Sequence, residues 1–158
     1  MKNLFVDYDF PYWEERFTVP YIEGVTILFV EILYAEHTDY LGELFPPGKE
    51  IYFHLLLELD KHFGDPADPS WALDYTGIPP NRFRKEFRDI TGAGFHDYLM
   101  LLRTFKGASR LVNTTDPVER IAYDCGFQTP ATFRKRIVKH YGMNPVSLRL
   151  SKVFNSFW

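Results

Sequence analysis

The 158-residue sequence predicts a mainly α-helical protein, with seven helices after residue 48 and a short N-terminal extension whose structure it leaves open. The first sign is a capping residue directly before a proline, which suits a helix start because the proline gives up an amide that has no partner there. The second is a glycine where a helix would end in left-handed backbone. The capping pairs are Asp68-Pro69, Asp116-Pro117, Thr129-Pro130 and Asn144-Pro145, and the glycines are Gly64, Gly77, Gly92, Gly126 and Gly142.

The first four helices are predicted over Glu50–Phe63, Pro69–Tyr75, Pro79–Thr91 and Gly94–Val112. The first of them carries Ile51, Leu55 and Leu59 one turn apart, which is the spacing of a buried helix face. The second and third each begin at a proline and end at a glycine. The fourth is the longest, and its 19 residues would span about 28 Å at about 1.5 Å per residue.

The last three helices are predicted over Pro117–Cys125, Pro130–Tyr141 and Pro145–Val153. Each begins at a proline that follows a capping residue. In the first of them, Asp116 and Glu119 also have the spacing of a capping box, in which each side chain would accept from a free amide of the other. The sequence therefore predicts sharply bounded helices throughout this part of the chain.

Residues 1–48 read as a separate extension that is acidic and rich in aromatic residues. Its run Tyr21–Ala35 is almost continuously apolar, so it fits either a buried strand or a buried helix. The loop from Phe45 to Gly48 marks the boundary. We expect the aromatic residues to form core or interface, and a homodimer through this extension is a candidate assembly.

Charge is divided unevenly along the chain, although the net charge is only −3. Residues 1–64 hold 4 basic and 12 acidic residues, whereas residues 78–152 hold 14 basic and 6 acidic ones. A basic segment within an acidic protein indicates either a polyanionic partner for that segment or a solvated charged surface.

Several function classes find no support in the sequence. The single cysteine, Cys125, excludes an internal disulfide, and the five histidines lack metal-ligand spacing. No glycine-rich phosphate loop is present. We therefore expect neither catalysis nor a cofactor or metal. The longest apolar stretch, Val25–Ala35, is too short to span a bilayer, and the start of the chain lacks a signal-peptide pattern, so the predicted location is the cytoplasm.

Two segments have helix-turn-helix organisation, Ser70–Gly92 and Val118–Gly142. In each, a short helix ends at a tight turn and a longer basic helix follows. The apolar residues of the second helix form one stripe, at Phe83 and Phe87 in the first unit and at Phe133 in the second. Basic residues lie off that stripe. Such a helix packs on one side and can offer the other to the major groove of double-stranded DNA.

The second unit and its surroundings resemble the signature of the AraC/XylS family of transcription regulators. The matching residues in the second half of the domain are Ile121, Ala122, Gly126, Phe127, Phe133, Lys139, Tyr141, Gly142, Pro145 and Arg149. Those in the first half are Phe83, Phe87, Gly92, Tyr98, Leu99 and Arg103. The resemblance covers about Lys49–Lys152. It implies a seven-helix domain, residues 49–158 here, that binds DNA and activates or sometimes represses transcription, with RNA polymerase as a candidate partner.

The candidate DNA-binding residues follow from the helix faces and from this resemblance. They are Asn81, Arg82, Arg84, Lys85, Arg88, Thr129, Arg134, Lys135 and Lys139. Many relatives carry Ser or Gln where this chain has Pro130 and Ala131, and Ala where it has Gly107, a residue that costs about 1 kcal/mol in mid-helix. Pro130 and Ala131, together with the acidic excess of residues 1–64, motivate an alternative function, a protein-interaction module derived from a DNA-binding domain that binds DNA weakly or only with a partner.

Overall fold

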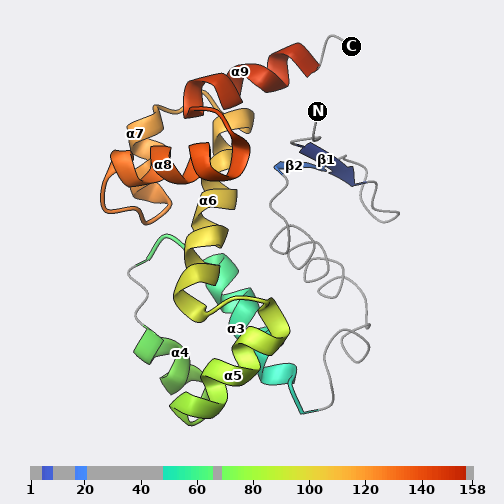
Figure 1. Ribbon diagram of the computed structural model, residues 1–158, viewed down its shortest axis with the longest axis vertical. Helices are drawn as coiled ribbons and strands as arrows, with labels where there is room; N and C mark the ends of the chain where they lie inside the picture. The colour runs from blue at the N-terminus through green and yellow to red at the C-terminus, as the bar shows by residue number, and fades with distance from the viewer. Residues whose placement is uncertain (1–4, 9–16, 21–47, 66–68, 156–158) are drawn as a thin grey trace. The chain divides into compact units, whose positions relative to one another are not determined.

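The structure, a computed structural model, describes residues 5–8, 17–20, 48–65 and 69–155, with side chains over 48–65 and 69–151 (Figure 1). Within these ranges the chain forms two short strands and seven α-helices. The elements are β1 (Phe5–Tyr8), β2 (Phe17–Pro20), α3 (Glu50–Lys61), α4 (Pro69–Thr76), α5 (Pro80–Thr91), α6 (Phe95–Asn113), α7 (Val118–Asp124), α8 (Pro130–Tyr141) and α9 (Pro145–Asn155). The predicted seven-helix fold is confirmed, with helix ends that differ by at most two residues from the predicted ones.

In the extension, β1 and β2 pair as an antiparallel ladder with Phe5 opposite Pro20 and Tyr8 opposite Phe17. The sequence had left the structure of this region open. The apolar run Tyr21–Ala35 lies outside the described residues. The proposed domain boundary after residue 48 stays a prediction.

The chain divides into two compact units, one of residues 23–102 and one of residues 1–22 with 103–158. Helix α6 has residues in both. The first unit contains α3, α4, α5 and the start of α6, and all four helices contribute buried apolar side chains to its core. Tyr52, Leu55 and Leu59 from this face are at most 1% exposed and pack with Phe83 and Phe87 of α5. Burial of each such side chain contributes about 1.5–3 kcal/mol.

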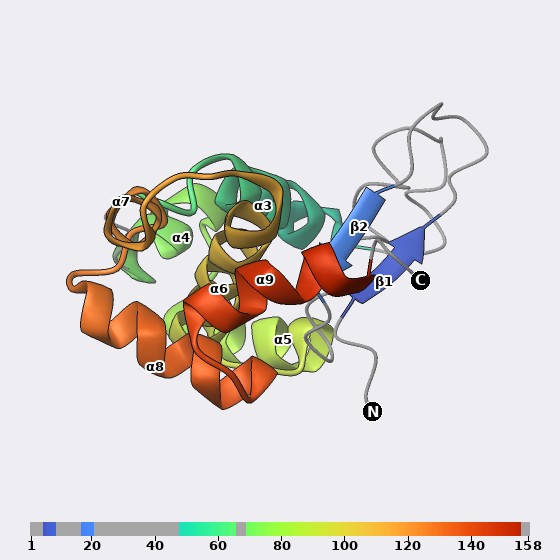
Figure 2. The ribbon, with the colours of Figure 1, turned by 90° about the horizontal axis from the view of Figure 1, so that it is seen from above.

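In the second unit, α7, α8 and α9 gather around the second half of α6 (Figures 1 and 2). Its core takes Phe105 and Leu111 from α6, Ile121 from α7, Phe133 from α8 and Leu148 from α9, all of them buried. Each of these helices thus contributes buried apolar side chains to the core, and the stripe predicted for Pro130–Tyr141 is confirmed at Phe133. Among the described helices, none combines the length and the apolar character that crossing a membrane needs.

Two arginines that matched the family pattern bind backbone carbonyls in this second unit. Arg103 is 9% exposed and donates to the carbonyl of Gly126 at 3.1 Å. Arg149 donates through Nε to the carbonyl of Leu111 at 3.0 Å and through Nη2 to that of Asp116. The two guanidiniums therefore donate hydrogen bonds to carbonyls at the end of α6 and in the turns that flank α7, where no helical amide is available to these carbonyls.

Helix starts agree with the predicted caps at two places. The Thr129 hydroxyl accepts from the amide of Thr132 at 3.2 Å, and the Asn144 side-chain oxygen accepts from the amide of Ser147 at 2.9 Å. The prediction for Asp116 is wrong, because α7 begins at Val118 and Pro117 takes the capping position without a side-chain bond. The Asp116 carboxylate instead accepts from Arg110 at 2.8 Å, a charged donor that competes with a neutral amide.

The predicted capping box at the same helix is also wrong, because Glu119 forms an ion pair with Arg134 of α8. At the helix ends, Gly77, Gly92, Gly126 and Gly142 have the predicted left-handed backbone.

Gly64 does not have left-handed backbone, since α3 ends earlier than predicted, at Lys61. A turn follows in which the amide of Asp65 donates to the carbonyl of His62 at 3.0 Å. The carboxylate of Asp65 also meets the imidazole Nδ1 of His62 at 3.1 Å.

Gly107 lies in the middle of α6, where it faces α8. A Cβ at this position would be 2.9 Å from Cζ of Phe133 and closer still to Cε2 of the same ring. The Phe133 ring is fully buried and lies 5.1 Å, centroid to centroid, from that of Phe127. The space that glycine leaves is therefore filled by an aromatic ring, which gives a packing reason for a residue that the helix itself disfavours.

Candidate nucleic-acid interface

The first helix-turn-helix unit is formed by α4, a tight turn and α5. Helix α4 ends where the amide of Gly77 donates to the carbonyl of Leu73 at 2.8 Å, with Gly77 at a φ of 65°. Ile78 and Pro79 then extend the backbone, and Pro80 starts α5 at a position that needs no amide. The turn thus redirects the chain within three residues, as a helix-turn-helix requires.

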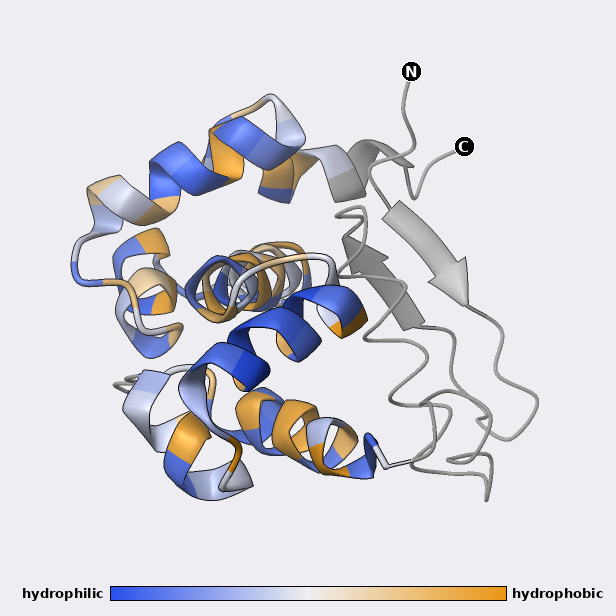
Figure 3. Ribbon diagram, turned by 60° about the horizontal axis from the view of Figure 1, so that its bottom comes forward, coloured by the Kyte–Doolittle hydropathy of each residue, from blue (hydrophilic) through white to orange (hydrophobic). Residues whose placement is uncertain are grey.

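Helix α5 has two different faces. Phe83 and Phe87 are buried against the core, whereas four polar side chains one turn apart are exposed on the outside. These four residues, Asn81, Arg84, Lys85 and Arg88, are called the outer stripe of α5 below. Figure 3 shows α5 as a largely hydrophilic ribbon interrupted by its few apolar positions. Within the described part of the chain, no carboxylate pairs with the three cations of the stripe.

Glu86 connects α5 to α3 beneath that stripe. Its carboxylate accepts from the Tyr52 hydroxyl at 2.8 Å and from Arg82 Nε at 2.9 Å, and it forms an ion pair with Lys49. The bond from Lys49, followed by that from Arg82, lowers the pKa of Glu86 to about 2. Burial and the neighbouring carboxylate raise the pKa of Tyr52 above its usual range. The ionised Glu86 therefore fixes the orientation of α5 on the core.

The second helix-turn-helix unit is formed by α7, a turn and α8. The turn passes through Gly126, at a φ of 84°, and the amide of Phe127 returns to the carbonyl of Ala122 at 3.0 Å. Cys125 is fully buried at this turn, and its burial raises the pKa of its thiol to about 11. This cysteine is a packing residue, because a reactive thiol needs exposure and a lowered pKa.

The exposed face of α8 differs from that of α5. The corresponding positions hold Ala131, Arg134, Lys135 and Val138, so two of the four side chains are apolar. Arg134 is already engaged by Glu119 of α7. Lys135 and the neighbouring Lys139 are exposed and have no ion-pair partner in the described ranges.

All nine candidate residues from the sequence are exposed on α5, on α8 or at the start of α8. Three of them already have a partner within the protein: Arg82 binds Glu86, Arg134 binds Glu119, and Thr129 caps α8. Sequence reasoning did not identify Glu86. The spacing of Arg82 and Glu86, one helical turn apart, was the available signal for their pairing.

The described residues contain no cluster of His, Cys, Asp and Glu side chains that could hold a metal ion.

Comparison with known families finds one matching model, described as a helix-turn-helix domain, over residues 73–151, which is half of the chain. The matched region begins in α4 and ends in α9, so it contains both units described above.

The curated relatives are longer proteins. The transcriptional regulator Rob of Salmonella typhimurium is 26% identical over 103 residues, which cover 65% of this chain and 36% of Rob. The HTH-type transcriptional regulator Rv1931c of Mycobacterium tuberculosis is 33% identical over 72 residues, 46% of this chain and 28% of that protein. The chain thus matches about a third of the length of these relatives.

Solved structures share the fold. The DNA-binding domain of AdpA, crystallised with a target DNA, superposes with a TM-score of 0.61 at 20% identity, over 65% of this chain and 92% of that one. The C-terminal domain of AraT, a response regulator from Geobacillus stearothermophilus, gives 0.60 at 22% identity, over 70% and 88% of the two chains.

Proposed function

Because the chain belongs to the AraC/XylS family of helix-turn-helix proteins, we propose that it is a sequence-specific DNA-binding transcription regulator. The observation that carries this proposal is the outer stripe of α5. Three cations that have no carboxylate partner among the described residues, and one carboxamide, are exposed there on a helix whose other face is anchored in the core. Such a surface offers both phosphate and base contacts.

In this proposal α5 reads base edges in a major groove. Asn81 can donate to and accept from one adenine, and Arg84 can donate both of its outer amines to one guanine. Lys85 suits a guanine or a phosphate, and Arg88 a phosphate. The network around Glu86 supports this role, since it holds α5 in place before DNA binds and so lowers the entropy lost on binding.

Helix α8 contributes mainly affinity. Ala131 and Val138 cannot exchange hydrogen bonds with a base edge, although an apolar side chain can contact the methyl group of thymine. Lys135 and Lys139 suit phosphates. Arg134 would have to leave Glu119 before it could reach a guanine, which weakens any net gain from that contact.

We place the two units on successive major grooves of one DNA duplex. Helix α6 has 19 residues and runs without a break from the first unit into the second. Its length of about 28 Å is of the order of the helical repeat of B-DNA, about 34 Å. A single chain would then bind an asymmetric site. Base preference would be strong in the half bound by α5 and weak in the half bound by α8.

Selection of binding sites from random DNA, followed by variants, tests this proposal. Arg84→Ala and Lys85→Ala should each weaken binding to the selected site by about 1–3 kcal/mol and relax the preference at one or two base pairs. Lys61→Ala is the matched control, because it removes one exposed cation from α3, which lies outside both helix-turn-helix units. Equal losses for all three variants, or two equally sharp half-sites, would contradict the assignment.

A salt titration on random duplex DNA separates this function from the alternative of a protein-interaction module. A DNA-binding protein loses affinity steeply as salt rises, because it releases counterions from the phosphates. Activation, with contacts to RNA polymerase, is the proposed sign of regulation, since the family resemblance implies it. Reporter transcription that falls when the protein is expressed would instead identify a repressor.

A further inference from the structure

Helix α8 carries two apolar side chains on the face that the proposed function turns toward DNA. Ala131, Arg134, Lys135 and Val138 have the spacing i, i+3, i+4 and i+7, so they form one exposed stripe. A recognition helix in a major groove can contact bases through four side chains with this spacing. Val138 is 48% exposed, so much of its surface is available to a base.

Arg134, which lies between the two apolar side chains, is bound within the protein. Its guanidinium Nη2 donates to Oε1 of Glu119, a residue in the first turn of α7. Helices α7 and α8 belong to the same unit and lie side by side (Figures 1 and 2). A move of Arg134 to a guanine would leave the Glu119 carboxylate without this partner, close to the DNA phosphates. Like charges brought together in an interface repel each other, so Glu119 opposes that move.

The chemistry of the stripe favours thymine over the other bases. Thymine alone presents a methyl group in the major groove, and an apolar side chain can contact it. The edges of guanine, cytosine and adenine present mainly polar groups there, which Ala131 and Val138 would cover without offering a hydrogen bond. Lys135 is a flexible point charge that suits a phosphate next to any base.

We propose that α8 selects thymine where Ala131 and Val138 meet the bases, and that Glu119 sets this selection by keeping Arg134 away from guanine. The inference rests on the proposed function, because it concerns the same DNA site. Burial of one methyl group corresponds to about fourfold in affinity, which is weaker than the discrimination of a bidentate arginine–guanine pair. Ala131 and Val138 are about 10 Å apart along α8, so the two thymines should lie within about three base pairs of each other.

The first experiment changes only the DNA. In the selected site, each thymine of the half bound by α8 is replaced in turn by deoxyuridine, which lacks the methyl group but pairs in the same way. Fluorescence anisotropy with the full chain should show an affinity lower by about fourfold at one or two of these positions. The same replacement in the half whose preference relaxes in Arg84→Ala is the control. It should have no effect, because Asn81, Arg84 and Lys85 recognise bases by hydrogen bonds.

Val138→Ser tests which side chain makes the contact. The variant should be insensitive to deoxyuridine at one position where the unsubstituted chain is sensitive, because the side chain that contacts that methyl group is gone. Substitution of an exposed residue has little effect on folding. Val146→Ser is the matched control, since Val146 is also an exposed valine but lies on α9. It should keep the full sensitivity.

Glu119→Gln removes the charge that holds Arg134. The freed guanidinium should shift the preference toward guanine at one base pair of the same half by about fivefold or more. Asp74→Asn is the matched control, because it also neutralises an exposed carboxylate, on the first helix of the other helix-turn-helix unit. That variant should raise the affinity for all sequences alike and leave the base preference unchanged.

Deoxyuridine without effect throughout the half bound by α8, or guanine preferred there by the unsubstituted chain, would overturn the thymine assignment. An unchanged base preference in Glu119→Gln would overturn the role of Glu119. Both results presuppose a selected site and so leave the proposed function standing. Failure to select any site from random DNA would instead refute the proposed function, and this inference with it.

Discussion

Replacement of Gly107 by alanine sets two opposed effects against each other in α6. The new Cβ would lie 2.9 Å from Cζ of Phe133 and nearer to Cε2, inside van der Waals contact with a ring that is fully buried. Phe127 packs against that ring, so the ring cannot move away without displacing a neighbour. The helix itself favours alanine, because glycine in a helix interior loses more backbone entropy on folding.

The magnitudes decide the sign. Insertion of a methyl group into a packed core costs about 1–3 kcal/mol, and exchange of glycine for alanine in a helix gains about 1 kcal/mol. We therefore expect Gly107→Ala to lower the free energy of unfolding by about 1 kcal/mol. In a chain of this size that corresponds to a fall of about 2–4 °C in the melting temperature.

Urea unfolding of a double-mutant cycle measures the clash itself. Phe133→Leu removes both Cε2 and Cζ, so Gly107→Ala should become neutral or stabilising in that background. The expected coupling free energy is about 1–3 kcal/mol, with the double variant more stable than the sum of the two single effects predicts. If Gly107→Ala alone raised stability by about 1 kcal/mol, the ring would not constrain this position and the packing argument would be refuted.

Three further predictions concern single side chains. Glu86 has a pKa of about 2 in the folded chain against an ordinary value of 4.5, so its carboxylate stabilises the fold above about pH 4.5 and this contribution is lost as the pH falls toward 2. The urea midpoint of Glu86→Gln should accordingly change less over that window than the unsubstituted midpoint, and parallel curves would contradict the network. Cys125, buried and with a raised pKa, should react with a thiol reagent only after unfolding, whereas rapid labelling of the native protein would show that it is accessible. Thr129→Ala should cost about 0.5–2 kcal/mol of unfolding free energy through loss of the cap, and the exposed loop residue Thr115, replaced in the same way, should cost little. A loss as large for Thr115 would rule out the cap as the cause.

Local chemistry made the helices predictable from the sequence. At Pro130 and Pro145, the capping side chain, the proline and the helix that follows are consecutive residues, so the sequence contains the whole interaction. The cap at Asp116 failed for the opposite reason. The Asp116 carboxylate could accept either from nearby amides or from Arg110. Which donor it binds depends on where α6 places that arginine.

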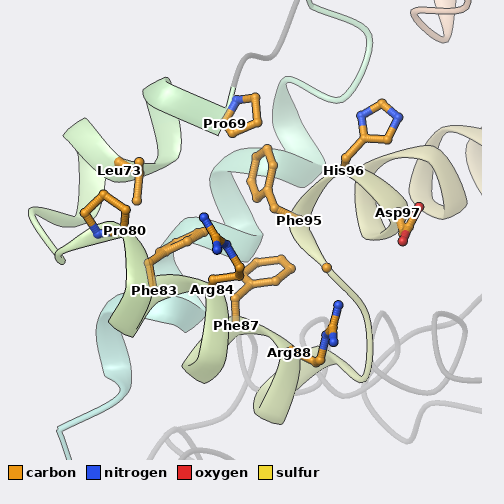
Figure 4. A pocket seen from close by; sticks show the side chains of 11 residues that line it. Pro69, Leu73, Pro80, Phe83, Arg84, Phe87, Arg88, Phe95, His96 and Asp97 are labelled. Atoms are coloured by element: carbon orange, nitrogen blue, oxygen red, sulfur yellow. The ribbon is translucent and has the colours of Figure 1, made fainter.

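The exposed residues of the candidate interface were also predictable from the sequence, whereas the contacts that hold α5 in place were not. Helical periodicity alone separates the outer stripe of α5 from Phe83 and Phe87. The Glu86 network was not predictable, because it joins α5 to Lys49 and Tyr52, which are 37 and 34 positions away in the chain. The hollow between α4, α5 and the first turn of α6 likewise depends on three segments that meet only in the fold (Figure 4). From the sequence alone, Gly107 is only a residue that destabilises a helix. The position of the Phe133 ring shows that glycine leaves the space that this ring fills.

The two faces of α5 also bear on how this protein can evolve. Its attachment to the core depends on Phe83, Glu86 and Phe87, whereas the four side chains of the outer stripe are exposed and substitutions there have little effect on folding. Mutations can therefore accumulate on the outer stripe under selection for a new DNA sequence while the inner face stays under selection for stability. Under the proposed function, the DNA sequence that descendants of this protein prefer can change faster than the residues that attach α5 to the core.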